Sequence, residues 1–172
     1  MKKNNNSGFS LIELLIVIAV IAVISAISAV SISYYSSQNQ KQAKNNVVSF
    51  MGKVQTYSMA KKSDIFLFIK ATSGDITLES GVLDQSTVGT GTTAYDMNLE
   101  KYKIPSKVPF TVVTSTGSYD LRSENHYFLV GFDRSTGAFS SVTVDGNDAG
   151  EISSINMGGE TVTVVWKTGK IF

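Results

Sequence analysis

Residues 7–32 read SGFSLIELLIVIAVIAVISAISAVSI, and this stretch decides how the rest of the chain is organised. From Leu14 to Ile32 it holds 19 residues without a charge, interrupted only by three serines. As an α-helix this length would rise about 28 Å, close to the roughly 30 Å of a bilayer's hydrocarbon core. The stretch therefore predicts a membrane segment or a signal sequence.

Three interpretations of residues 1–33 use these residues differently. A secretory signal peptide would take Lys2 and Lys3 as its positive region and be cut among the small residues 25–29. A signal anchor would keep the same helix uncleaved, with the two lysines in the cytoplasm. Neither interpretation accounts for Glu13, because a carboxylate inside an apolar helix is costly without a partner and by default marks function.

The third interpretation rests on the order of residues 8–15, GFSLIELL, which follow a short Lys- and Asn-rich beginning. This order resembles the class III signal of type IV prepilins, and we favour it. The resemblance implies cleavage between Gly8 and Phe9, methylation of the new Phe9 amine, and retention of the apolar helix. Removal of the leader, residues 1–8, would leave 164 of the 172 residues and take away two lysines, so the net side-chain charge would change from +1 to −1.

The resemblance also implies a role for Glu13 in assembly. In a packed filament its carboxylate can meet the Phe9 amine of another subunit, and a fully made buried ion pair is tolerated where a half-made one is costly. The hypothesis is that Glu13 sets the axial register of the subunits. The alternative is an interfacial carboxylate without a partner.

The helical pattern continues beyond the apolar run. Apolar and small residues recur at steps of three and four, and no proline lies between Phe9 and Ile104. The pattern predicts one helix over residues 9–62, with a membrane and filament-core half (9–33) and an amphipathic half (34–62). The buried stripe of the second half is expected to comprise Ala43, Val47, Phe50, Met51, Val54, Tyr57 and Ser58.

Residues 63–172 change to short runs with β-type composition, separated by turn clusters. The prediction is an α+β protein whose long N-terminal helix packs on a C-terminal antiparallel β-sheet, which is the type IV pilin fold that the resemblance implies. Residues 80–100 are rich in Gly, Ser and Thr and predict a long surface loop. The clearest predicted strands are 65–69, 110–114, 127–132, 139–144 and 161–166.

A second resemblance concerns the order of elements in the globular part. A helix ending at residues 53–62, a strand at 65–70, a hairpin at 132–137 and a closing segment at 164–171 resemble H-type minor pseudopilins and T-type fimbrial minor pilins. The chain departs from many major pilins because it has no cysteine pair. This departure favours a minor subunit.

The composition excludes several kinds of chemistry. With no Cys and one His, the chain lacks thiolate nucleophiles and Cys-ligated metal sites, and the sequence contains no phosphate-binding Gly-rich loop. A Ser–His–Asp site around His126 has no supporting Gly-x-Ser-x-Gly motif. The acidic loop 145–151 has oxygen ligands for Ca²⁺ but not the EF-hand spacing, so a solvated hairpin turn is favoured. We expect no enzyme, no catalytic residue, no cofactor and no metal.

Two lysines close the chain beside its one tryptophan. Lys167 and Lys170, next to Trp166, could form a small basic and aromatic patch for DNA. The alternative, which we favour, is an edge strand guarded by lysines with Trp166 in the core. The net charge of +1 provides no general attraction for nucleic acid.

These observations predict a structural subunit, a minor pilin or pilin-like protein, of a type IV pilus or a related secretion or competence pseudopilus. The resemblance implies as partners other pilin subunits, a prepilin peptidase and methyltransferase, an assembly platform protein, a separate ATPase and the membrane. It places the subunit first in the membrane and then in a surface pilus or envelope pseudopilus, which can serve adhesion, twitching motility, protein secretion or competence. The alternative is a membrane-anchored extracellular module for adhesion or DNA uptake that does not polymerise.

Overall fold

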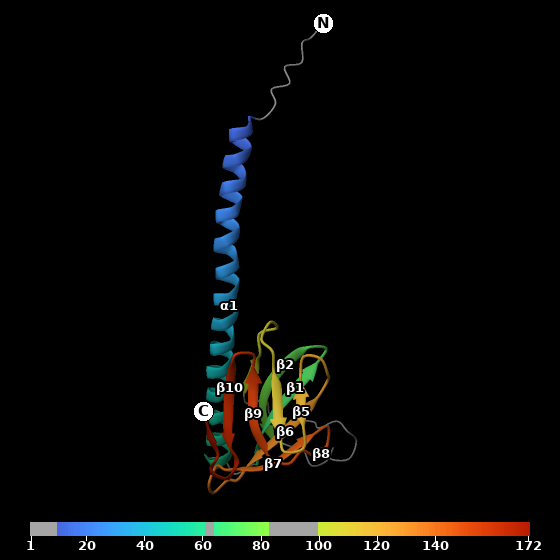
Figure 1. Cartoon of the computed structure of the whole chain (residues 1–172). Coiled ribbons are helices and arrows are strands. Elements are labelled where there is room, and N and C mark those ends of the chain that lie inside the picture. Colours follow the sequence, from blue (N-terminus) through green and yellow to red (C-terminus); the bar gives the residue numbers. More distant parts are fainter. Residues whose placement is uncertain (1–9, 61–63, 83–99) are drawn as a thin grey trace. The chain divides into compact units, whose positions relative to one another are not determined.

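The computed structural model describes residues 10–60, 64–82 and 100–172, without the side chains of residues 27–33. The chain divides into two compact units, residues 1–37 and 38–172, and one helix, α1 (Leu11–Ala60), contributes to both (Figure 1). Helix α1 accounts for most of the helix predicted over 9–62, whose two ends lie outside the described residues. The predicted boundaries at residues 8, 33 and 62 stay predictions.

The first unit is a stretch of helix with apolar side chains on every side. Eleven large apolar side chains between Leu11 and Ile24 are 49–83% exposed. The Ser25 hydroxyl donates to the Ile21 carbonyl at 2.8 Å, so this polar group is satisfied within the helix. Across the described residues, no helix combines the length and hydropathy of a membrane span. The side chains of residues 27–33, part of the predicted segment 14–32, lie outside that description.

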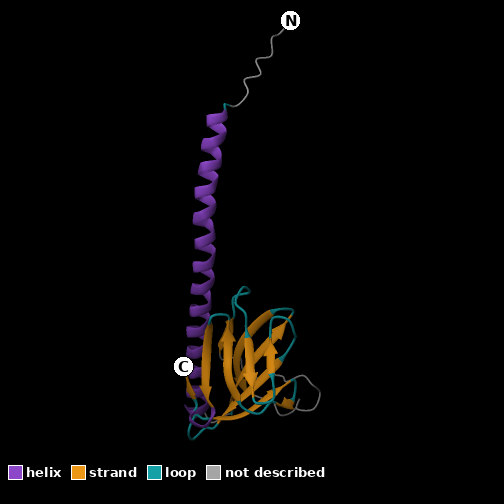
Figure 2. Cartoon of the chain, viewed as in Figure 1, coloured by secondary structure: helices purple, strands orange, loops and turns teal. Residues whose placement is uncertain are grey.

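The second unit places the C-terminal part of α1 beside strands of two antiparallel sheets (Figure 2). The first sheet has the order β3-β2-β1-β6-β7-β8 and the second the order β11-β10-β9-β4-β5. In chain order the strands are β1 (Ile65–Thr72), β2 (Asp75–Val82), β3 (Glu100–Lys103), β4 (Thr111–Thr114), β5 (Ser118–Asp120), β6 (Tyr127–Phe132), β7 (Phe139–Val144), β8 (Asn147–Asp148), β9 (Ile152–Met157), β10 (Glu160–Val165) and β11 (Lys170–Ile171), with a 3₁₀ turn, η2 (Trp166–Thr168), before the last.

The α+β class and the antiparallel pairing are confirmed, and all five predicted strands are present. The strands divide between two sheets where a single one was expected. The loop predicted over residues 80–100 is wrong at both ends, because β2 continues to Val82 and β3 begins at Glu100. Residues 83–99 lie outside the described part of the chain.

The predicted stripe of α1 forms the helical side of the hydrophobic core. Ala43, Val47, Met51 and Val54 are at most 1% exposed. They belong to one cluster with the inward-facing side chains of both sheets. Tyr57 is only half-buried, and its hydroxyl donates to the Glu100 carboxylate at 3.1 Å. Burying this stripe fixes which face of the helix meets the sheets.

Two glutamines of α1 tie distant turns to the helix. The Gln55 side-chain amide donates to the carbonyls of Gly137 and Gly169, the latter at 3.0 Å. The Gln40 side-chain oxygen accepts from the Gly159 amide at 3.0 Å. Gly169 has a φ of +67°, and a Cβ there would lie 2.4 Å from the Gly137 carbonyl oxygen. Both the backbone conformation and the space therefore require glycine at residue 169.

A carboxylate is buried on the first sheet. Glu79 of β2 is 3% exposed, and its oxygens lie 2.7 Å from Lys70 Nζ on β1 and 2.7 Å from Lys101 Nζ on β3. Burial acts to raise the pKa of Glu79, but the hydrogen bonds to Lys101 and Lys70 outweigh it and the pKa is lowered. The three side chains thus join three neighbouring strands.

This arrangement predicts an acid-dependent contribution to stability. Glu79→Gln should lower the free energy of unfolding at pH 7 by about 2–3 kcal/mol, because it removes a charged acceptor from two lysines. Since the folded-state pKa is lowered, the contribution is present above the unfolded-state pKa, near pH 4.3, and is lost as the pH falls through the folded-state pKa. Urea unfolding of the full chain in detergent micelles between pH 3 and pH 7 measures both effects.

The matched control is Asp75→Asn on the same strand. Asp75 and Lys103 form a 2.9 Å ion pair, but their side chains are 58% and 60% exposed. An exposed pair contributes at most about 1 kcal/mol, so the control should change stability less. Equal effects of the two substitutions would contradict the role given to Glu79.

Candidate assembly site at the helix N-terminus

The residues expected to act in processing and assembly lie at the start of α1. Gly8 and Phe9 lie outside the described residues, whereas Ser10 and Glu13 are described and exposed. Glu13 is the one acidic residue in the first turn of α1. A carboxylate at this end of a helix interacts favourably with the positive end of the helix dipole.

Ser10 and Glu13 form a reciprocal pair of hydrogen bonds. The Ser10 amide donates to Glu13 Oε2 at 2.8 Å, and the Glu13 amide donates to Ser10 Oγ at 3.2 Å. The Leu14 amide donates to the Ser10 carbonyl at 3.2 Å, which starts the helical hydrogen bonding. This is a capping box, in which a serine and a glutamate three residues later satisfy amides that the helix leaves unpaired.

The capping box gives Glu13 a local role that the sequence analysis did not assign. The signal was present, because a serine three residues before a glutamate at the head of an apolar run is a helix-start pattern. A carboxylate has two oxygens with several acceptor positions, so Glu13 can accept from Ser10 and from a further donor together. The geometry therefore holds the carboxylate at the helix end while leaving it able to accept a hydrogen bond from a positively charged group.

Comparison with known families identifies this region. A family model described as the prokaryotic N-terminal methylation motif matches residues 3–29. The chain carries a class III prepilin signal. Such a signal is typical of type IV pilins and pseudopilins. The chain matches no curated protein and no solved structure in these comparisons.

The prepilin signal has consequences for the processing, assembly and location of the protein. It implies cleavage by a prepilin peptidase, dependence on assembly machinery, a membrane-anchored precursor and a location in the envelope or pilus. Proteins of the type IV pilin family are structural subunits and not enzymes, in agreement with the predicted class of protein.

The two lysines considered for DNA contact lie at the end of the second sheet. Lys167 in η2 is exposed and lines a cleft of about 400 Å³, and Lys170 on β11 is exposed outside that lining. Trp166 is half-buried and stacks on Phe139, with ring centroids 5.5 Å apart. The cleft is lined by Ser115, Glu151, Ile152, Ser153, Val164, Val165, Trp166 and Lys167.

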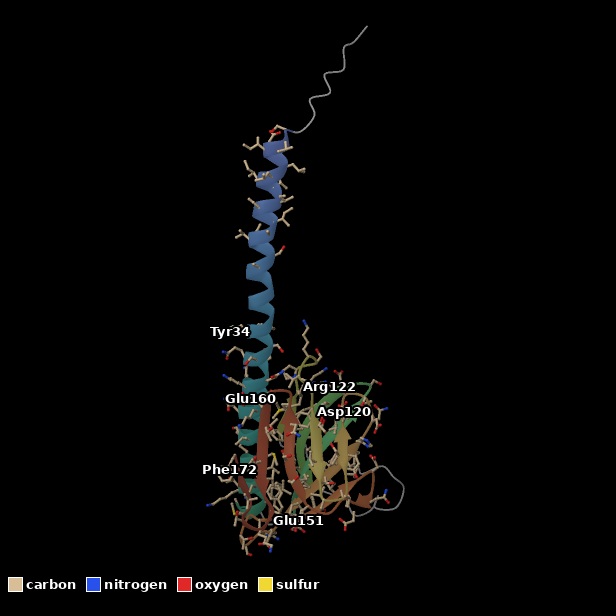
Figure 3. All side chains as sticks on the ribbon, in the orientation of Figure 1. Tyr34, Asp120, Arg122, Glu151, Glu160 and Phe172 are labelled. Carbon is tan, nitrogen blue, oxygen red and sulfur yellow. The ribbon has the colours of Figure 1, made fainter. Side chains whose placement is uncertain are left out.

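The cleft does not present a purely basic surface. Glu151 lines it together with Lys167, and Figure 3 shows Glu151 at the end of the unit away from Asp120 and Arg122. A carboxylate in the same cleft opposes the attraction of Lys167 for a phosphate backbone. Trp166 packs against the hydrophobic core but is only half-buried, whereas the favoured alternative placed it in the core. DNA contact by Lys167 and Lys170 stays a prediction.

His126 lies between two carboxylates. Its Nδ1 is 2.8 Å from Asp145 Oδ2, and its Nε2 is 2.9 Å from Glu124 Oε2. The Tyr119 ring meets the imidazole edge to face at 5.2 Å. Because both ring nitrogens contact carboxylates, neither is placed to take a proton from a serine, and the Ser–His–Asp alternative loses its base.

The acidic loop 145–151 is a hairpin turn with internal hydrogen bonds. Asp145 has a φ of +51°, and its Oδ1 accepts from the Tyr127 amide at 2.8 Å. Asp148 Oδ1 accepts from the Gly150 amide at 3.0 Å. Within the described residues, no group of three His, Cys, Asp or Glu residues could hold a metal ion.

The two carboxylates make stability depend on the protonation of His126. Burial acts to lower the pKa of His126, but hydrogen bonds to Asp145 and Glu124 raise it overall. The stabilisation that the two carboxylates give through His126 is therefore full below the unfolded-state pKa of histidine, near 6.5. It is lost as the pH rises through the folded-state pKa of His126. The free energy of unfolding should fall as the pH rises above about 6.5 in the parent protein and change less in His126→Gln.

Glu124→Gln provides the intermediate case, because it removes one of the two carboxylates and leaves Asp145 in place. Its pH-dependent loss of stability should be smaller than that of the parent, as measured by urea unfolding at each pH. A parent whose stability is constant over this range would refute the role given to the pair.

Proposed function

We propose that this protein is a minor pilin or pilin-like subunit of a type IV pilus, or of a related secretion or competence pseudopilus, and that it polymerises through its N-terminal helix after leader cleavage and N-methylation. The observation that carries the proposal is the continuity between the prepilin signal at residues 3–29 and helix α1. The motif supplies the processing site, and the helix supplies a rod that remains after the leader is removed.

The exposed side chains of the first unit support polymerisation through the helix. Eleven large apolar side chains surround it between Leu11 and Ile24. Full burial of one such side chain is worth about 1.5–3 kcal/mol, so this surface needs lipid or other helices around it. Exchanging lipid for neighbouring helices keeps these side chains out of water throughout assembly.

The capping box supports a role for Glu13 in that exchange. Ser10 holds one side of the carboxylate, and the Phe9 amine of a neighbouring subunit would supply the second, positively charged donor. A buried carboxylate without its cation is costly, so only an axial position that pairs the two groups is stable. Glu13 and Phe9 together would then set the register of subunits.

The partners follow from the same proposal. A prepilin peptidase and methyltransferase would act at Gly8 and Phe9, and other pilin subunits would surround the helix. A platform protein and an ATPase would drive assembly, since the sequence contains no phosphate-binding loop of its own. Nucleic acid is not among the proposed partners.

The direct test is the mass of the N-terminal peptide. Protein taken from its native membrane and surface fractions should begin at Phe9 and carry a methyl group on that amine. Gly8→Val should leave the leader attached, because a small residue at the cleavage site is lost, and should keep the protein out of the filament fraction.

Two outcomes would contradict processing. A chain that begins near Ala29 would indicate a secretory signal peptide, and a chain that still begins at Met1 would indicate a signal anchor. A correctly processed protein that never enters the filament fraction would point instead to a membrane-tethered module.

Substitutions at Glu13 separate charge pairing from helix capping. Glu13→Gln keeps an acceptor for the Ser10 amide but removes the charge, whereas Glu13→Ala removes both. If pairing with Phe9 sets the register, both variants should lose incorporation into filaments, measured by quantitative immunoblot of sheared surface material. If capping alone matters, Glu13→Gln should assemble like the parent.

The controls lie on the same helix. Ser10→Thr keeps a capping hydroxyl and should behave like the parent, while Ser10→Ala should reduce incorporation less than Glu13→Ala does. Ser25→Ala removes a hydroxyl that bonds only within the helix and should have no effect. Unchanged assembly of Glu13→Ala would contradict any role for this carboxylate.

A further inference from the structure

Two adjacent tyrosines stand on α1 directly after the apolar run. Tyr34 and Tyr35 are 68% and 65% exposed, and Tyr34 is labelled on the helix in Figure 3. Residues 14–33 before them contain no charge, and residues 36–42 after them are all polar. The tyrosines therefore mark the change from an apolar to a polar helix surface.

Tyrosine has the chemistry of a membrane–water boundary. Its ring is apolar while its hydroxyl forms hydrogen bonds, and tyrosine and tryptophan are enriched at both interfaces of membrane proteins. Adjacent positions on an α-helix point about 100° apart, so the two rings cover a broad arc of the helix surface. Their exposure leaves both rings available to headgroups.

The spacing from Glu13 fits the thickness of a bilayer. Tyr34 follows Glu13 by 21 residues, which at 1.5 Å per residue is about 31 Å along the helix. The hydrocarbon core of a bilayer is about 30 Å thick. The Ser10–Glu13 capping box provides polar groups at one end of this interval, and the two tyrosines provide them at the other.

We infer that Tyr34 and Tyr35 form an aromatic anchor in the outer headgroup layer of the membrane and fix the depth of the helix while Glu13 lies at the inner boundary. This inference rests on the proposed function, because it requires a membrane-inserted precursor. The partner surface is the layer of lipid headgroups and glycerol backbones. Without the anchor, the apolar helix is followed by five uncharged polar residues, 36–40, before the first lysine, Lys41, and can slide further into the bilayer.

The absence of cysteine from the chain permits a direct measurement of depth. A single nitroxide label is attached to the leaderless full chain at Val23→Cys or at Ser37→Cys, and the protein is placed in phosphatidylcholine–phosphatidylglycerol vesicles. Val23 lies about 16 Å along the helix from Tyr34, near the middle of the proposed span. Accessibility of each label to oxygen and to a water-soluble nickel chelate reports its depth.

The parent should show a label at residue 23 reached by oxygen but not by nickel, and a label at residue 37 reached by nickel. Tyr34→Ser with Tyr35→Ser should lower nickel access at residue 37, because the helix sinks. Tyr34→Trp with Tyr35→Trp should restore the parent value. Gln38→Ser with Gln42→Ser, a matched exposed pair on the same helix, should leave it unchanged.

Three results would overturn the inference, and they differ from one another. If nickel access at residue 37 is unchanged in the serine variant and residue 23 is still shielded, the tyrosines are not an anchor, although the helix is inserted in the membrane. Nickel access at residue 23 in the parent overturns insertion itself and the anchor with it. An effect of the serine variant seen only at high protein-to-lipid ratio assigns the tyrosines to contact with a second copy of the chain.

Discussion

A single helix must satisfy two different surroundings, and the rest of the structure depends on this constraint. Over its first turns α1 is apolar on all sides, which requires an environment without water around the whole circumference. From Ala43 onward only one stripe is apolar, and that stripe is covered by the two sheets. The sequence suits both surroundings because the apolar surface narrows from the whole circumference to one stripe while the helix continues without a break.

The second unit is held by contacts between residues far apart in the chain. Gln55 reaches Gly137 and Gly169, and Glu79 joins strands β1, β2 and β3 through two lysines. The Gln55 contacts connect two turns to the helix, and the Glu79 contacts connect three strands of the first sheet to one another. The fold is therefore specified by a few buried or half-buried polar groups as well as by its hydrophobic stripe.

The features that repeat locally were predictable from the sequence. The steps of three and four in α1 gave the buried stripe, and the runs rich in branched and aromatic residues gave five strands. Strand β2 was missed because Glu79, Ser80 and Gly81 interrupt its apolar pattern, and their burial depends on partners on other strands. Strand β9 (Ile152–Met157) was missed because serines and an asparagine dilute it.

The candidate site shows the same difference between features visible in the local sequence and contacts that depend on the folded geometry. Glu13 was found because an isolated carboxylate in an apolar run is conspicuous, and Ser10 was overlooked because its value lies in a geometry of two reciprocal hydrogen bonds. The two sheets could not be separated from sequence, since the order of strands is decided by pairing at long range. The contacts of His126 with Glu124 and Asp145 likewise appear only after the turns have folded.

The end of the chain is built into the fold. Phe172 exchanges two backbone hydrogen bonds of 3.0 Å with Thr163, and Gly169 accepts from Gln55, which precedes it by 114 residues. These residues are made long after the helix that Gly169 contacts, because the chain is synthesised from its N-terminus. The contact between Gln55 and Gly169 therefore forms only after the intervening chain has been made, so helix α1 is complete well before the second unit can close.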